Sequence, residues 1–171
     1  NNQENVKELS ANVANTLVEQ IDHLSKIAAD FSQFDNIGNV YTTVFDLHEV
    51  LFSLKELFAT NEKVSFAWNA VQGQVMLEAD KTQMNRLFTN LFANALEACS
   101  EKNHCHIIVN EKRENNHIVI SIRDNGEGIP PEMQERIFVP NFTTKSSGTG
   151  LGLAMCKGIV EQAKGRIWFE T

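Results

Sequence analysis

Two asparagines, Asn90 and Asn94, lie four positions apart in a stretch that is otherwise apolar. Four positions make about one turn of a helix, so the two side chains share one face. Amide oxygens are hard ligands of the kind that Mg²⁺ takes where it bridges a protein to phosphates. Asn is a poor helix former, and two of them inside an apolar helix must face a cavity or a partner. The pair is a weak signal by itself, because a solvated polar face has the same pattern.

A second candidate site is the turn over 124–130, with the sequence Asp-Asn-Gly-Glu-Gly-Ile-Pro. Gly126 and Gly128 permit unusual backbone angles and let a flat ring approach the chain closely. Asp124 ends a predicted strand, and its carboxylate is suited to accept a hydrogen bond from the N6 amine of adenine, where guanine has a carbonyl. These residues favour an adenine site, but an ordinary surface turn explains them equally well.

A third candidate is the glycine-rich segment 147–153, Ser-Gly-Thr-Gly-Leu-Gly-Leu, which opens a predicted helix. Free backbone N–H groups at the start of a helix, together with the helix dipole, form a binding site for phosphate. The segment lacks the lysine of a P-loop. It also follows no clear strand of a dinucleotide-binding unit. Taken alone, it predicts phosphate binding only weakly.

The elements that must position these residues follow from the spacing of apolar side chains. Asp46 and Asp80 are plausible N-caps of two helices. The mixture of elements predicts the α+β class, with a mixed sheet covered by about three helices behind a long N-terminal helix. We predict helices over 5–34, 45–58, 81–100, 132–137 and 150–162, strands over 64–68 and 74–78 around a turn near Gly73, a hairpin of strands over 106–113 and 117–124, and a last strand over 166–169.

The composition limits the class of protein. The 171 residues carry a net charge of −7 and 42% of them are hydrophobic, which favours a globular domain and argues against a broad nucleic-acid surface. No apolar run approaches the ~20 residues that span a bilayer, and the polar start is unlike a signal peptide. There are three cysteines, Cys99, Cys105 and Cys156, and no two of them form a CxxC motif. We therefore expect buried thiols of a reducing compartment and no disulfide.

The order and spacing of the candidate segments resemble those of sensor histidine kinases. Asn90–Ala98 resembles their N box, Asp124–Pro130 the G1 box, Ile137–Lys145 the F box with a short ATP lid, and Gly148–Leu153 the G2 box. The resemblance covers residue 45 to the end, and the short lid and the NALEA sequence are most similar to kinases of the nitrogen-regulation type. It implies the catalytic and ATP-binding domain of the gyrase, chaperone, histidine kinase and mismatch-repair ATPase superfamily, a two-layer α/β sandwich called the Bergerat fold.

The resemblance also implies roles for single residues. Asn94 matches the asparagine that binds Mg²⁺, Asn90 and Lys145 would act with it on the phosphates, and Asp124 matches the residue that binds adenine. One departure is Glu97, where many of these kinases carry Lys or Arg, which leaves more of the phosphate contacts to Lys145 and the metal. The expected ATP-binding set is Asn90, Asn94, Asp124, Gly126, Gly128, Ile129, Phe142, Thr144, Lys145, Gly148, Thr149, Gly150, Leu151 and Gly152.

The domain organisation follows from the same resemblance and from the long first helix. The helix carries one apolar stripe, which calls for a partner helix, and it is similar to the second helix of the kinase dimerisation hairpin. We expect 1–35 to be part of that hairpin, 36–43 to be a linker, and 44–171 to be the ATP-binding domain with a truncated last strand. The parent protein is then expected to be a homodimer.

Asn90 bears on the kind of reaction. The ATPases of the superfamily carry a glutamate one turn before the metal-binding asparagine, where this chain has Asn90. An amide cannot take a proton from water, which favours phosphoryl transfer to a protein side chain over hydrolysis. The resemblance implies transfer from ATP to a histidine of a dimerisation domain, and then to an aspartate of a response regulator. An ATPase or an anti-sigma-type serine kinase is the alternative from the same fold, and a non-catalytic scaffold is a third.

The histidine acceptor is not evident in the sequence. His48 is followed by Glu49, as in the H box of the family, but the basic residue, Asn and Pro of that box are missing, and His23 lacks the box as well. We therefore expect the acceptor to precede Asn1. We expect the catalytic part to be cytoplasmic, with an anchor of the parent in a bacterial inner membrane left open.

Overall fold

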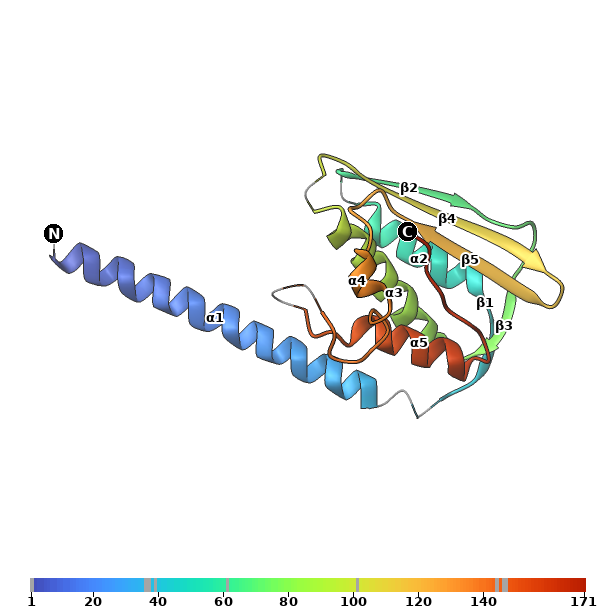
Figure 1. Ribbon diagram of the computed structural model, residues 1–171, viewed down its shortest axis with the longest axis horizontal. Coiled ribbons are helices and arrows are strands. Elements are labelled where there is room, and N and C mark those ends of the chain that lie inside the picture. The colour runs from blue at the N-terminus through green and yellow to red at the C-terminus, as the bar shows by residue number, and fades with distance from the viewer. Residues whose placement is uncertain are drawn as a thin grey trace.

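The computed structural model describes residues 2–35, 38, 40–60, 62–100, 102–143, 145 and 148–171. A long helix leads into a body in which strands lie on one side and helices on the other (Figure 1). In chain order the elements are α1 (Asn2–Asp35), β1 (Thr43–Asp46), α2 (Leu47–Phe58), β2 (Val64–Asn69), β3 (Met76–Ala79), α3 (Lys81–Ala98), β4 (Cys105–Glu114), β5 (His117–Arg123), α4 (Pro131–Gln134) and α5 (Gly152–Gln162).

The strands form a three-stranded sheet and a two-stranded sheet. In the larger sheet, ordered β2-β4-β5, β2 runs parallel to β4, and β4 and β5 form the predicted antiparallel hairpin. In the smaller sheet, β1 and β3 pair antiparallel. The larger sheet is therefore mixed, and α2, α3 and α5 lie together on one side of it (Figure 1). This arrangement confirms the predicted α+β class and the mixed sheet covered by helices.

Helix α3 occupies the centre of the core. Phe92 is fully buried, and its ring meets those of Phe58, Phe66 and Phe88. Asp80 caps the helix as predicted, because its carboxylate accepts from the backbone N–H groups of the first turn. Helix α3 packs against both α2 and α5, and these contacts lie on the side away from its polar residues. They fix the orientation of the helix.

Helix α2 begins later than predicted, because the residues just before it form strand β1. Asp46 is the N-cap as expected, but its Oδ1 accepts from the backbone N–H groups of both His48 and Val75, each at 3.1 Å. The second contact ties the residue to the chain just before β3. Residues 43–46 are consequently extended and pair with β3, so the predicted helix start at 45 was wrong.

Three further local predictions need correction. The strands predicted over 64–68 and 74–78 do not pair with each other, because β2 joins β4 and β3 joins β1. Helix α5 begins at Gly152 rather than at 150. Residues 166–169 are described but form no strand, although Ile167 packs against the core.

Helix α1 extends away from the body (Figure 1). Val13, Leu17, Ile21 and Leu24 are each more than half exposed, so the predicted apolar stripe has little cover. Among the helices of the described ranges, none has both the length and the apolar character that crossing a membrane requires.

Candidate functional site

The two asparagines of the candidate site lie on α3, on the side opposite its buried residues. Asn90 and Asn94 are half-buried, and Glu97 is exposed one turn further on. Asn90 Nδ2 donates to the carbonyl oxygen of Arg86 at 2.9 Å, which orients this amide along the helix. The buried face of the same helix consists of Gln83, Met84, Leu87, Phe88, Phe92 and Ala95.

The glycine-rich segment meets α3 at Asn90. A Cβ placed on Gly152 would lie 3.5 Å from Asn90 Oδ1, so the first residue of α5 packs directly against that side chain. Leu151, the buried N-cap residue, gives α5 no side-chain cap. The backbone N–H groups at this helix start therefore lack the usual side-chain acceptor, which is the condition for binding an anion there.

Gly150 joins this segment to the F box. Its φ of +68° lies in the left-handed region, and a Cβ there would come within 2.6 to 2.9 Å of backbone atoms of Asn141 and Phe142. The close approach requires glycine. Phe142 itself is half-buried, and the Arg136 guanidinium lies over its ring at 4.3 Å from the centroid. Gly148, two positions before Gly150, closes a turn in which its N–H donates to Lys145 O at 3.2 Å.

Lys145 reaches α3 one turn beyond Asn90. Its Nζ donates to Asn94 Oδ1 at 3.3 Å and also forms an ion pair with Glu97. One ammonium group is thus shared by two oxygen acceptors on the same helix face. Thr144, which was predicted to belong to the site, lies outside the described residues.

The predicted adenine turn meets the last residue of α3. Asp124 Oδ1 accepts from the backbone N–H of Gly126 at 2.8 Å. A Cβ on Gly126 would lie 2.7 Å from both Cβ and O of Ala98, so this position has no space for a side chain. Gly128 has a φ of +75° and lies against Thr171 instead. Ile129 is half-buried, and its carbonyl oxygen accepts from Nε2 of Gln134, the last residue of α4, at 3.0 Å.

Residues from the 124–130 turn and from the 145–152 stretch therefore converge on successive turns of one helix. Gly152 packs at Asn90, Lys145 at Asn94, and Gly126 at Ala98. The amide oxygen of Asn94 on this face fits a divalent cation, because it already accepts from a positively charged group. A nucleotide laid along the face would have backbone N–H groups at one end and a carboxylate at the other.

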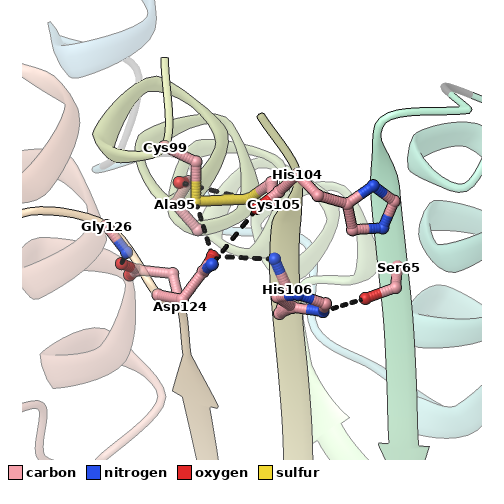
Figure 2. The surroundings of a disulfide bond; sticks show 9 residues. Ser65, Ala95, Cys99, His104, Cys105, His106, Asp124 and Gly126 are labelled. Atoms are coloured by element: carbon pink, nitrogen blue, oxygen red, sulfur yellow. Dashed lines mark hydrogen bonds between the residues drawn. A yellow bond between two sulfur atoms is a disulfide. The ribbon is translucent and has the colours of Figure 1, made fainter. Parts of the chain in front are cut away.

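A disulfide lies behind the adenine turn, which corrects the expectation of free thiols. Cys99 ends α3 and Cys105 begins β4, and this return of the chain brings their Cα atoms to 5.5 Å, a distance suited to a disulfide. Figure 2 shows Asp124 and Gly126 beside the pair. Asn125 ties the turn to the same place, because it accepts from His106 N at 2.8 Å and donates to His104 O at 3.1 Å. The sequence contained no signal for the pairing, since six positions separate the cysteines without a known motif.

Cys156 is the remaining cysteine, and it does not belong to the site. It is fully buried on α5 and its Sγ lies 3.7 Å from Leu87 O. Burial raises the pKa of this thiol to about 12, because the thiolate would have to lose its water. It is therefore a core residue and not a nucleophile.

Thr149 makes a contact that sequence reasoning missed. Its hydroxyl donates to Asp30 Oδ2 of α1 at 2.7 Å, which links the glycine-rich segment to the long helix. The two residues are separated by most of the chain, and no local pattern connects them. Thr149 therefore turns its side chain towards α1.

A hollow of about 620 Å³ lies elsewhere, at the N-terminal end of α3. Tyr41, Thr43, Lys81 and Arg86 are among the residues that line it, and it includes none of the predicted nucleotide-binding residues. Asp80, also in its wall, is occupied by capping. The pKa of its carboxyl is affected most by burial, which raises it. The backbone N–H donors and Arg86 outweigh this effect, and the net pKa lies below the usual value.

Comparison with known proteins places this geometry in a family. Residues 79–171 match the family described as histidine kinase-, DNA gyrase B-, and HSP90-like ATPase. The chain is 26% identical over 161 residues to the sensor histidine kinase ZraS of Salmonella typhimurium. The alignment covers 92% of this chain and 34% of that protein. The chain thus spans about a third of the length of the curated relatives it matches.

Solved structures agree with the described fold. The catalytic domain of histidine kinase ThkA is 32% identical, with a TM-score of 0.68 over 75% of this chain and 86% of that one. A crystal structure of ThkA in complex with the response regulator protein TrrA is 26% identical, with a TM-score of 0.74 over 92% of this chain and 46% of that one.

Proposed function

Because the chain belongs to the family of histidine kinase-, DNA gyrase B-, and HSP90-like ATPases, we propose that it is the catalytic and ATP-binding part of a sensor histidine kinase. It would transfer the γ-phosphoryl group of ATP to a histidine of a dimerisation domain. The observation that carries the proposal is the convergence of Gly152, Lys145 and Gly126 on one face of α3. This face offers the three features that a bound nucleoside triphosphate needs: an acceptor for the base, a cation, and backbone donors for the phosphates.

ATP would bind along this face in a defined direction. Asp124 is proposed to accept from the adenine amine, since Gly126 N already holds one of its oxygens in place. Gly126, Gly128 and Ile129 would flank the ring. The phosphates would lie at the other end, at the uncapped start of α5 and the residues Phe142, Thr144, Gly148, Thr149, Gly150, Leu151 and Gly152 around it.

Mg²⁺ is the proposed cofactor, and Asn94 is its proposed protein ligand. The support is chemical: the side-chain oxygen is hard, lies on the surface of a rigid helix, and already accepts from the Lys145 ammonium at 3.3 Å. When bound, the ion would neutralise phosphate charge. Lys145 would hold the phosphates in line for transfer, which is the main requirement of phosphoryl transfer.

Asn90 favours a kinase over an ATPase. Its amide donates to the Arg86 carbonyl and has no basic group with which to take a proton from water. A protein nucleophile such as a neutral imidazole needs no such base at physiological pH. An ATPase or an anti-sigma-type serine kinase on the same fold remains the alternative.

The acceptor histidine is proposed to come from another segment. His48 is held in the body of the domain: its Nε2 lies 2.8 Å from the fully buried carboxylate of Glu111, and its ring contacts Trp68 at 5.4 Å. A histidine in this setting is a packing residue. Residues 1–35 would belong to a dimerisation hairpin, with 36–43 as a linker and 44–171 as the catalytic domain, and the exposed apolar stripe of α1 supports this division.

The remaining partners are proposals that follow from the same assignment. The parent would be a homodimer of the nitrogen-regulation type, and it would pass the phosphoryl group to an aspartate of a response regulator. The crystal structure of ThkA in complex with the response regulator TrrA is a precedent in a relative. The catalytic part would function in the cytoplasm of a bacterium, whether or not its parent is anchored in the inner membrane.

The test is transfer in trans. The chain is mixed with γ-labelled ATP, Mg²⁺ and a separate dimerisation hairpin that carries an H box. Acid-labile label on the hairpin supports the proposal, steady phosphate release without the hairpin supports an ATPase, and acid-stable label supports a serine kinase. Asn94→Ala should abolish the label. Asn85→Ala is the matched control and should leave the label unchanged. Asn85 lies on the same helix outside the proposed site, and its amide donates to the carbonyl four residues back.

A further inference from the structure

The ion pair between Glu97 and Lys145 lies inside the proposed ATP site. Glu97 is three positions after Asn94 on α3, so the two side chains are neighbours on one helix face. Lys145 comes from a different segment, and its Nζ contacts both the carboxylate of Glu97 and Asn94 Oδ1, the latter at 3.3 Å. The carboxylate and the proposed metal ligand therefore share one ammonium group.

This pair contributes little to the stability of the fold. The Lys145 and Glu97 side chains are 44% and 50% exposed, and the attraction within such a pair is weakened by the surrounding water. The effect of the pair is instead on position. A lysine side chain has several rotatable bonds, and two acceptors on a rigid helix restrict where its charge lies.

The location of the charge matters because α3 itself offers no cation at this turn. The polar groups there are the amide of Asn94 and the carboxylate of Glu97, and without Lys145 the local charge would be negative. A triphosphate would be repelled by that carboxylate. With Lys145 in place, the turn presents a positive group beside the oxygen that is proposed to bind the metal.

We propose that Glu97 is a positioning residue for phosphoryl transfer, which holds the Lys145 ammonium beside Asn94 on α3. This inference rests on the proposed kinase function. Glu97 itself touches neither the metal nor the phosphates; it acts through Lys145. Its carboxylate has two opposed effects on the substrate, since it repels the phosphates but fixes the cation that orients them. Binding and rate should therefore respond differently when the charge is removed.

A double-mutant cycle with Glu97→Gln and Lys145→Met tests the proposal. Glu97→Gln keeps the shape and removes the charge, so the rate of transfer to the hairpin should fall about tenfold while the ATP Kd changes less than about threefold. Lys145→Met should weaken ATP binding about tenfold, because a charged hydrogen bond to phosphate is lost. Adding Glu97→Gln to Lys145→Met should lower the rate no further, since Glu97 positions the cation only through Lys145. It should tighten ATP binding, because the unpaired carboxylate no longer repels the phosphates.

Glu49→Gln is the matched control. Glu49 pairs with Lys81 at 2.7 Å with side-chain exposures of 62% and 44%, a surface pair of the same kind away from the site. This variant should keep the wild-type rate and Kd. Wild-type transfer by Glu97→Gln, or a Glu97→Gln loss of full size on the Lys145→Met background, would overturn the positioning role.

A second measurement separates this inference from the proposed function. The Kd values of ATP and ADP are measured for all four proteins of the cycle by displacement of a fluorescent nucleotide, without any acceptor. If the wild type binds ATP but labels no hairpin, the kinase assignment fails. The inference then stands only if Lys145→Met reduces the preference for ATP over ADP, and if Glu97→Gln raises that preference on the Lys145→Met background but not in the presence of Lys145. Independent effects of the two substitutions refute it.

Discussion

Gly150 should tolerate no side chain, and Gly150→Ala measures how tightly the glycine-rich segment and the F box are packed together. The residue combines a φ of +68° with backbone neighbours on one side. A Cβ would lie 2.6 Å from Asn141 C, 2.7 Å from Phe142 N and 2.9 Å from Asn141 Cα. Non-bonded carbon atoms are most stable at about 3.5–4.0 Å, so the two chain segments would have to separate by about 1 Å.

The expected cost has two parts. Left-handed backbone costs an alanine about 1–2 kcal/mol. The smaller conformational entropy of its unfolded chain recovers about 0.4–1 kcal/mol, which leaves a net of about 1 kcal/mol. The collision adds a cost of the kind that overpacking gives, about 1–3 kcal/mol, because backbone cannot rotate away as a side chain can. Gly150→Ala should therefore lower the free energy of unfolding by about 2–4 kcal/mol.

Gly73→Ala isolates the first part. Gly73 has a φ of +77° and nothing within 4 Å of its Cβ position, so only the backbone term applies. Urea denaturation should give a loss of about 1 kcal/mol for this variant. Its ATP affinity should equal that of the wild type, because Gly73 lies in a turn far from α3's polar face.

The assay pairs urea denaturation with displacement of a fluorescent nucleotide. If the loop moves instead of the domain unfolding, the collision in Gly150→Ala appears as a loss of ATP affinity of about tenfold or more, since each 1.4 kcal/mol is a factor of ten. The reasoning is refuted if Gly150→Ala matches Gly73→Ala in both stability and affinity. In that case the segments are not packed as described.

Three further predictions concern other parts of the chain. Asp124→Asn should weaken ATP binding about 10- to 100-fold, because a hydrogen bond to a charged acceptor is lost, and an unchanged Kd in nucleotide displacement would exclude the adenine role. Native protein without reductant should take up no maleimide at pH 8 by mass spectrometry, since Cys99 and Cys105 are paired and the pKa of buried Cys156 is raised to about 12; one label on the native protein would contradict the burial of Cys156, and three labels should appear only after reduction and unfolding. Asp80→Asn should destabilise the domain at pH 7 by about 1 kcal/mol, because the backbone N–H donors around the carboxylate would lose a charged acceptor. The lowered folded pKa of Asp80 makes this difference shrink below about pH 4, and urea denaturation at pH 7 and pH 3 would disagree with that reasoning if the difference stayed constant.

Local sequence signals predicted the elements well where one cause determined the structure. Asp80 followed by an amphipathic stretch located α3, and the alternation on both sides of 114–116 located the β4–β5 hairpin. In each case the hydrogen-bond partner lies within a few residues. The start of α2 failed because Asp46 serves two partners, the near one at His48 and the distant one at Val75. The sequence showed only the near one.

Long-range partners account for the other misses. The parallel pairing of β2 with β4 depends on α3 crossing between them, and no pattern within 64–79 reveals it. The disulfide depends on where the chain re-enters the sheet after α3. The contact from Asp30 to Thr149 spans 119 positions. Motif order was sufficient to predict that these segments come together, but not which atoms meet at α3.

The residues of α3 explain why the site could be recognised from the sequence at all. Each asparagine in a helix costs up to about 0.7 kcal/mol relative to Ala, and Asn90 and Asn94 contribute nothing to the core. The opposite face offsets this cost, because Met84, Phe88 and Phe92 are almost fully buried. The same burial fixes the helix against movement, so it holds both amides at defined positions on its polar face. Where a stable helix carries a polar residue that has no structural role, that residue indicates a functional site.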